Sequence, residues 1–210
     1  DETFTDIQGH WAENVIKTLA ESDKISGVGD GKFNPDGTVT RAEFLKMAMD
    51  SFGIVGHAYR DGECLDATND DWYCYYLQGA LDKDIIPKEM IENCNVTKVT
   101  KTLAEATDDK KAVTTDVNVY TGKFDGDKPI TREEMAAIAV RCKNYKMRRL
   151  TDWNNERRYP IFSFKDSDEI DEKYISDVVE AYNLNYIDGM EDGRFAPKEN
   201  LTRAQAAVVM

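Results

Sequence analysis

The stretch Thr40-Arg41-Ala42-Glu43 opens an apolar run, and the chain holds two further copies of it, Thr131-Arg132-Glu133-Glu134 and Thr202-Arg203-Ala204-Gln205. Each copy predicts a capping box at a helix start, because the Thr hydroxyl can accept from the N–H three residues on, where Glu or Gln reaches back. The arginine has no such local role, since the first helical turn favours carboxylates by roughly 0.3 to 1 kcal/mol. Three arginines at one disfavoured position predict an external anion as their partner.

The sequence around these triplets repeats as well. Residues 25–33 match residues 187–195, which lie 162 positions further on. The middle copy keeps Gly122-Lys123-Phe124 in the place of Gly31-Lys32-Phe33, but an insertion of 30 residues separates this segment from Ile86. The chain therefore contains three tandem repeats, of which the second is interrupted.

Each repeat is expected to open with an aromatic residue two positions before an aspartate. These openings are Phe4-Thr5-Asp6, Tyr59-Arg60-Asp61 and Phe164-Lys165-Asp166. Apolar residues then recur at helical spacing over residues 11–19, 72–81 and 174–182. Aromatic residues in such stripes, Trp11 and Trp72 among them, are more often part of the core than a ligand platform.

The helix predicted after each triplet is apolar nearly all round, which is typical of a buried helix. Three such helices could pack around a common axis, so that each repeat buries its apolar face against its neighbours. We therefore expect a mostly helical fold in which three repeats form a pseudo-threefold trimer around a central three-helix bundle. The third run stops in mid-pattern at Met210, so its last helix is expected to be truncated.

The expected boundaries follow from this periodicity, and together the parts are expected to form one domain. Repeat one covers residues 1–56, repeat two 57–145 with an insertion at about 87–121, a basic connector 146–163 and repeat three 164–210. Within the insertion, the alternation over Val113–Tyr120 predicts a strand, whereas Thr100–Thr107 has a weak helical pattern.

The charge balance narrows the classes of partner. The chain has 40 acidic and 27 basic residues, and its net charge of −13 repels nucleic acid and anionic lipid at long range. No apolar stretch is long enough to span a bilayer, and the N-terminus lacks a basic and apolar leader, so membrane insertion is not expected. If the protein is exported, its signal has already been removed.

The four cysteines lack the close paired spacing of a zinc site. An even number in a cysteine-poor chain is typical of two disulfides in an oxidising compartment. Three pairings are possible, and we favour Cys64 with Cys74, whose short separation could tie a loop to a helix start, which leaves Cys94 with Cys142. The alternative is four buried free thiols.

The layout resembles the S-layer homology domain family. Units of that family run from an aromatic-x-Asp opening and a Trp-bearing helix, through Gly-x-x-Asp-Gly-x-Phe-x-Pro, to a Thr-Arg-Ala-Glu helix. Repeat one matches throughout, at Phe4, Asp6, Trp11, Gly27, Asp30-Gly31, Phe33, Pro35 and the first triplet. Repeat two departs through its insertion and has Gly126 in place of the proline, and repeat three has Gln205 in place of Glu.

The resemblance implies a secreted, non-catalytic module on the bacterial surface that anchors S-layer proteins or surface enzymes to cell-wall glycans. In several members the ligand is a secondary cell-wall polymer with ketal-linked pyruvate, which the motif arginine contacts in a groove. By this resemblance the glycan-binding residues are Arg41 first, then Arg203 and Arg132, with Trp11, Trp72, Gly27 and Gly31. Replacing Arg41 by Ala is then expected to weaken wall binding with little change in melting temperature.

Two other functions compete with glycan binding. In a surface scaffold that contacts other S-layer or surface proteins, each arginine would pair with an acid such as Asp30, Asp127 or Asp192. In a calcium module, residues 30–37 and 125–127 would hold the cation, although Pro35 interrupts the spacing of an EF-hand.

Neither catalysis nor a cofactor is expected. The two histidines, His10 and His57, lie in no metal or triad motif, and the chain has no nucleophile elbow or phosphate loop.

Overall fold

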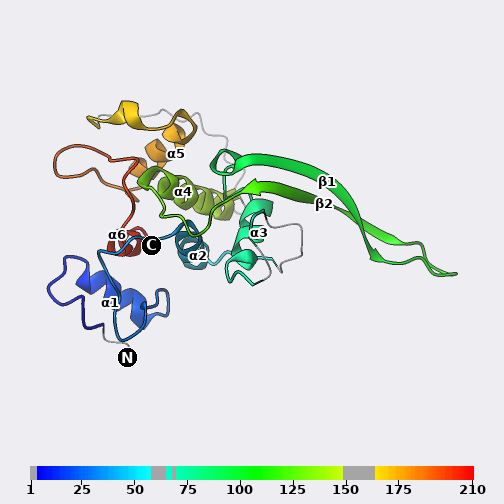
Figure 1. Cartoon of the computed structure of the whole chain (residues 1–210), viewed down its shortest axis with the longest axis horizontal. Coiled ribbons are helices and arrows are strands. Elements are labelled where there is room, and N and C mark those ends of the chain that lie inside the picture. Colours follow the sequence, from blue (N-terminus) through cyan, green and yellow to red (C-terminus); the bar gives the residue numbers. More distant parts are fainter. Residues whose placement is uncertain (1–3, 58–64, 68–69, 149–163) are drawn as a thin grey trace.

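The computed structural model of the protein describes residues 4–57, 65–67, 70–148 and 164–210. In these residues it is rich in helix and contains one two-stranded antiparallel sheet (Figure 1). The elements are α1 (Glu13–Glu21), α2 (Arg41–Ser51), α3 (Cys74–Asp82), the 3-10 turn η1 (Lys88–Met90), β1 (Glu92–Ala104), β2 (Val113–Lys123), α4 (Arg132–Arg148), the 3-10 turn η2 (Ser167–Glu169), α5 (Glu172–Asn183) and α6 (Arg203–Val209).

Helices α2, α4 and α6 begin at the three motif arginines, as their caps predict. The hydroxyls of Thr40, Thr131 and Thr202 each accept from the backbone N–H three residues on. Glu134 and Gln205 also accept from the backbone N–H of their cap residue, so these two helices have complete capping boxes. In α2 the box is half made, because the carboxylate of Glu43 points to another partner.

Helix α4 forms the middle of the body, where it packs against α2 and α5 (Figure 1). Residues 135–140 of α4 are all buried, which explains why its sequence is apolar nearly all round. A second apolar cluster joins the two ends of the chain, because Ala204 and Ala207 of α6 pack with Phe4, Ile16 and Phe33 from the first repeat.

Three backbone hydrogen bonds link the segments that precede α2, α4 and α6. Val39 N donates to the carbonyl of Leu201 at 3.1 Å, Leu201 N to Ile130 at 2.9 Å, and Ile130 N to Val39 at 2.8 Å. The three residues are fully buried. The bonds close a cycle, so the segments before α2, α4 and α6 lie next to one another in the core.

The insertion forms a long β-hairpin that extends away from the helical body (Figure 1). The strand expected over Val113–Tyr120 is confirmed as part of β2, whereas the helical prediction for Thr100–Thr107 is wrong, because β1 continues to Ala104. The β-branched residues of this segment favour a strand over a helix once a partner strand is present. Met90, Ile91 and Tyr120 bury their side chains in the main core and fix the base of the hairpin.

Candidate functional site

The three motif arginines each reach into the loop of a different repeat. Each guanidinium donates to the backbone carbonyl of a buried phenylalanine and lies over the ring of the same residue. The pairs are Arg41 with Phe124, Arg132 with Phe195 and Arg203 with Phe33, with N···O distances of 2.6, 2.8 and 2.7 Å and guanidinium-to-ring distances of 6.0, 5.2 and 4.6 Å. Each arginine thus contacts a phenylalanine that lies 63 to 170 residues away in sequence.

Each of the three phenylalanine loops is also held by one aspartate. The two carboxylate oxygens of Asp6, Asp66 and Asp166 accept from the backbone N–H groups of the phenylalanine and of the residue after it, at 2.7 to 3.0 Å. In the second repeat this residue is Asp66. The predicted opening Tyr59-Arg60-Asp61 lies outside the described residues. The sequence analysis therefore missed Asp66.

Arg41 is closed off from solvent. Its side chain forms an ion pair with Glu134, and the two residues are 9% and 4% exposed. Tyr174 of α5 is also buried, in the same core cluster as Phe124, the phenylalanine that Arg41 contacts. The strongest expected glycan contact thus has a carboxylate and a carbonyl of the protein itself as partners.

Arg132 is also buried, but its partners are backbone carbonyls. Besides Phe195, its Nη2 donates to the carbonyl of Asp188 at 3.1 Å. Burial lowers the pKa of this guanidinium, and the nearby Glu199 and Asp166 oppose that shift. Arg132 therefore links the start of α4 to the backbone at Asp188 and Phe195.

Arg203 differs, because it lines a cavity of about 340 Å³. Its Nη2 donates to the carbonyl of Ser26 at 2.8 Å, while its Nη1 is 3.5 Å from a carboxylate oxygen of Glu43, a loose contact. The cavity lining combines residues between α1 and α2, helix α2 itself, one residue before α3 and the first residue of α6. These residues are Asp23, Lys24, Ile25, Ser26, Gly27, Val28, Phe33, Glu43, Lys46, Met47, Trp72 and Arg203.

Gly27 is required where it stands in this wall. A Cβ at this position would lie 2.6 Å from the Phe4 ring and 2.6 Å from the carbonyl oxygen of Lys32. Gly31 has a positive φ of 67°, which L-residues rarely adopt, but open space around it. Both glycines shape the loop, and Gly27 also lines the cavity.

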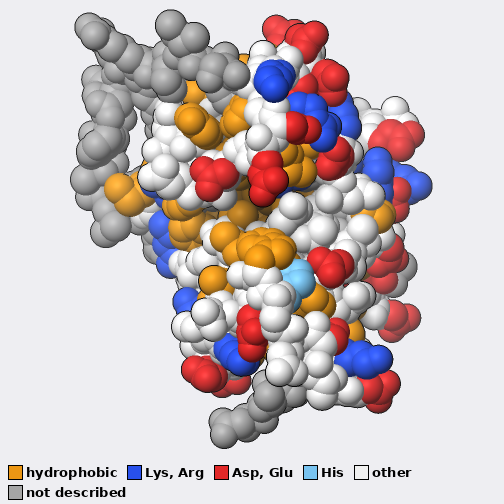
Figure 2. Space-filling model, turned by 90° about the vertical axis from the view of Figure 1, so that its left-hand side faces the viewer, with side chains coloured by type: hydrophobic (Ala, Val, Ile, Leu, Met, Phe, Trp, Pro, Cys, Tyr) orange, Lys and Arg blue, Asp and Glu red, His pale blue; other side chains and the backbone are white. Residues whose placement is uncertain are grey.

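The two candidate tryptophans are exposed, so the expectation that they belong to the core is wrong. Trp11 is 65% and Trp72 53% exposed, and the adjacent Ala12 and Tyr73 take the buried positions. Trp72 lines the cavity beside Arg203. The ring of Trp11 lies 5.4 Å from that of His10 at a tilt of 36°, and Nε2 of His10 lies 3.0 Å from Asp36. Figure 2, on the side of α1 and α6, shows hydrophobic side chains exposed among acidic ones.

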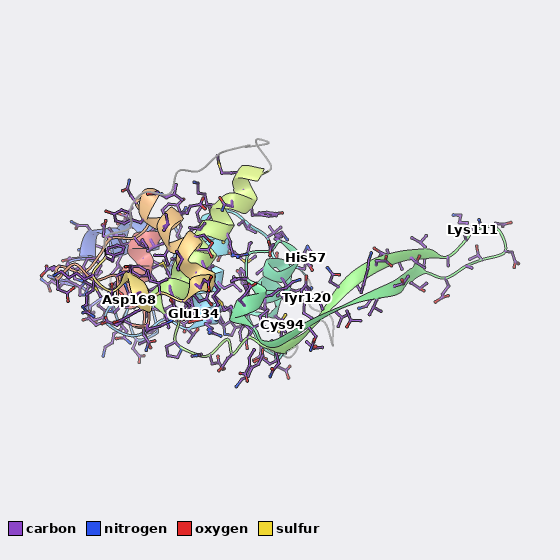
Figure 3. The ribbon with its side chains drawn as sticks, turned by 90° about the horizontal axis from the view of Figure 1, so that it is seen from above. His57, Cys94, Lys111, Tyr120, Glu134 and Asp168 are labelled. Carbon is purple, nitrogen blue, oxygen red and sulfur yellow. The ribbon has the colours of Figure 1, made fainter. Side chains whose placement is uncertain are left out.

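The predicted disulfide between Cys94 and Cys142 is not formed. Both thiols are free, and Cys142 is buried within α4 while Cys94 lies in β1 at the base of the hairpin (Figure 3). Burial raises the pKa of Cys142 to about 12, so this thiol is unreactive at neutral pH. Cys64, the other half of the pair predicted for Cys74, lies outside the described residues.

Two further polar contacts are ion pairs at the surface. Asp192 binds Arg194 at 2.7 Å instead of a motif arginine, and His57 lies 2.5 Å from Asp82. Within residues 4–57, 65–67, 70–148 and 164–210, no three His, Cys, Asp or Glu side chains are placed to hold a metal ion. In the same ranges, no helix has the length and apolar character that crossing a membrane requires.

Comparison with known proteins identifies two of the three repeats. The S-layer homology domain model matches residues 3–45 and 163–207. The chain is 33% identical over its whole length to an amylopullulanase of Thermoanaerobacterium thermosulfurigenes, and 33% identical over 99% of its length to the exoglucanase XynX of Acetivibrio thermocellus. An endoglucanase of Bacillus sp. (strain KSM-635) is 30% identical over 99% of the chain. The chain spans 9%, 16% and 18% of the length of these three proteins.

Proposed function

This chain belongs to the S-layer homology domain family, and on that premise we propose that it is a surface-anchoring module that binds an anionic cell-wall polysaccharide in the cavity beside Arg203 and Trp72. The matched region is a small, non-catalytic part of polysaccharide-degrading enzymes, in keeping with the role of an anchor. The cavity carries the proposal, because it joins a cation, an exposed aromatic ring and polar backbone groups.

The chemistry of the lining fits an acidic sugar. Lys24, Lys46 and Arg203 supply positive charge, and Arg203 can offer its loosely held Nη1 to a carboxylate such as that of a pyruvate ketal. A sugar ring could stack on the exposed face of Trp72. The net charge of −13 opposes an anionic polymer, but salt screens it beyond roughly 8 to 10 Å, so the local contacts decide.

We also propose that the three repeats form one pseudo-threefold unit. The cyclic hydrogen bonds among Val39, Ile130 and Leu201 support this arrangement, and so does the cyclic order of the arginine contacts. In this unit Arg41 and Arg132 hold the repeats together, and Arg203 both holds its loop and faces the glycan.

Sedimentation with purified bacterial sacculi tests the proposal. We expect binding that is lost when the anionic secondary polymer is removed chemically from the wall. Trp72→Ala should weaken binding by roughly 3- to 10-fold, the value of one aromatic contact. Trp11→Ala is the matched control, because it removes an exposed tryptophan outside the cavity. Equal binding to stripped and intact sacculi, or equal loss in both variants, would contradict a single glycan site beside Trp72.

A further inference from the structure

The β-hairpin has more exposed surface than such an element can maintain alone. Isolated two-stranded hairpins are marginal in water and usually need a third strand or a packed face. Here Val99, Leu103 and Val113 are exposed, and Figure 3 shows Lys111 at the tip of the hairpin, far from the helices. In the part of the chain that the structure describes, β1 and β2 pair only with each other, so each has a free edge.

The two free edges differ in how well they resist pairing. Edge strands are protected by charges, above all lysines, and β1 has Lys98 and Lys101 at mid-strand. Between Val113 and Gly122, β2 has one charged residue, Asp116, which already accepts from Thr100 Oγ1 at 2.7 Å and pairs with Lys98 Nζ at 3.1 Å. The outer edge of β2 is therefore the unprotected one.

The charge distribution favours a second copy of this chain as the partner strand. The hairpin has five acidic and five basic residues between positions 92 and 123, so the whole net charge of −13 belongs to the rest of the chain. Two bodies with this charge repel each other, whereas two neutral hairpins do not. A strand of 13 residues spans roughly 40 Å, well beyond the screening length of about 10 Å, so pairing at the hairpins keeps the bodies apart.

We propose that residues 115–119 of β2 pair antiparallel with the same residues of a second copy, about a twofold axis at Val117. In this register Val117 faces its own copy and Thr115 faces Val119, so β-branched side chains meet on one face. On the other face Asp116 lies opposite Asn118, and no two like charges meet. The result is a four-stranded sheet that continues the apolar face formed by Val99 and Val117, which are partners across the hairpin.

Sedimentation-velocity measurements over a wide concentration range test this pairing. The wild-type chain should pass from monomer to dimer as its concentration rises. Val117→Lys should raise the dissociation constant at least tenfold, because two lysines then lie directly opposite each other. Val99→Lys is the matched control, since Val99 is on the same face and the same rung but on the other strand. It should leave the dimer within about twofold of wild type.

Mixing two variant chains completes the test. Equal amounts of Val117→Lys and Val117→Glu chains should restore the dimer, because opposite charges then meet at the axis. Hydrogen exchange should slow with concentration at the amides of residues 115–119 and not at those of β1. A chain that stays monomeric at all concentrations, an equal loss in both lysine variants, or a mixture that does not recover would each overturn the proposal.

Discussion

The surroundings of Arg203 and those of Arg41 are built from equivalent positions, yet Arg203 lines a cavity whereas Arg41 is buried in an ion pair. Glu43, Lys46 and Trp72 line the cavity beside Arg203. The counterparts of Glu43 and Lys46 beside Arg41 are Glu134 and Ala137, both buried.

The difference lies in what the glutamate does. Glu134 uses one carboxylate oxygen for the cap of α4 and the other for the ion pair with Arg41. The carboxylate of Glu43 does not accept from the backbone N–H of Thr40 and lies 3.5 Å from Nη1 of Arg203. The same motif therefore forms a buried ion pair at Arg41 and part of a cavity wall at Arg203, and the contacts of the glutamate differ between the two.

The largest effect on stability is expected at the buried Arg41. Arg41→Ala leaves Glu134 as an uncompensated buried charge, so we expect a loss of about 3 to 5 kcal/mol in the free energy of unfolding. This replaces the expectation from sequence that the melting temperature would hardly change. Arg203→Ala should cost only about 1 to 3 kcal/mol, because its partners are backbone carbonyls and a half-exposed acid.

Urea denaturation of the two variants compares these costs. Glu134→Gln is the control variant. It removes the negative charge of Glu134, while its side-chain oxygen can still accept from the backbone N–H of Thr131. If Arg41→Ala and Arg203→Ala lose the same small amount, the two positions do not differ in the way the structure implies.

A second test concerns Asp177, a poorly paired acid on α5. Asp177 of α5 lies 3.9 Å from Arg141, and burial raises its pKa to about 6, with Glu180, Glu89 and Asp84 adding to the shift and Arg141 opposing it. Because the folded pKa is above the unfolded value of 3.8, this group stabilises the fold at low pH and loses that contribution as pH rises through 6.

Asp177→Asn should therefore raise the free energy of unfolding at pH 7.5 by on the order of 1 to 3 kcal/mol. The advantage over wild type should shrink as the pH falls from 6 to 4, where the native aspartate becomes protonated. Thermal unfolding of both chains across this range measures the difference. A constant difference at all pH values would show that Asp177 does not titrate with a raised pKa.

The sequence predicted the parts of the molecule that local chemistry determines. The caps at Thr131 and Thr202 and the buried character of α4 follow from residues that act on their own helix. The partners of the arginines could not be predicted in the same way, because each guanidinium reaches a loop 56 to 177 residues away in sequence.

The exposure of Trp11 and Trp72 was missed for a similar reason. A helical stripe indicates which side chains share a face, but near a helix start the neighbouring Ala12 and Tyr73 can fill the core instead. Asp66 could have been found from spacing alone. Asp6 precedes Trp11 by five positions, and Asp66 precedes Trp72 by six, whereas Asp61 precedes it by eleven.

The smallest effect tests whether the open site recognises a negative charge. Glu43→Gln removes an acid from the cavity and frees Nη1 of Arg203, while the backbone cap between Glu43 N and Thr40 stays in place. Affinity for an anionic wall polymer should therefore rise by roughly 2- to 5-fold, the size of one partly exposed ion pair. Asp109→Asn at the hairpin changes the net charge equally but lies far from the cavity, so it should have no effect. The gain should fade at high salt, since screening weakens every contact between charges. Equal gains in both variants would mean that the polymer senses the net charge of −13 and not the site beside Arg203.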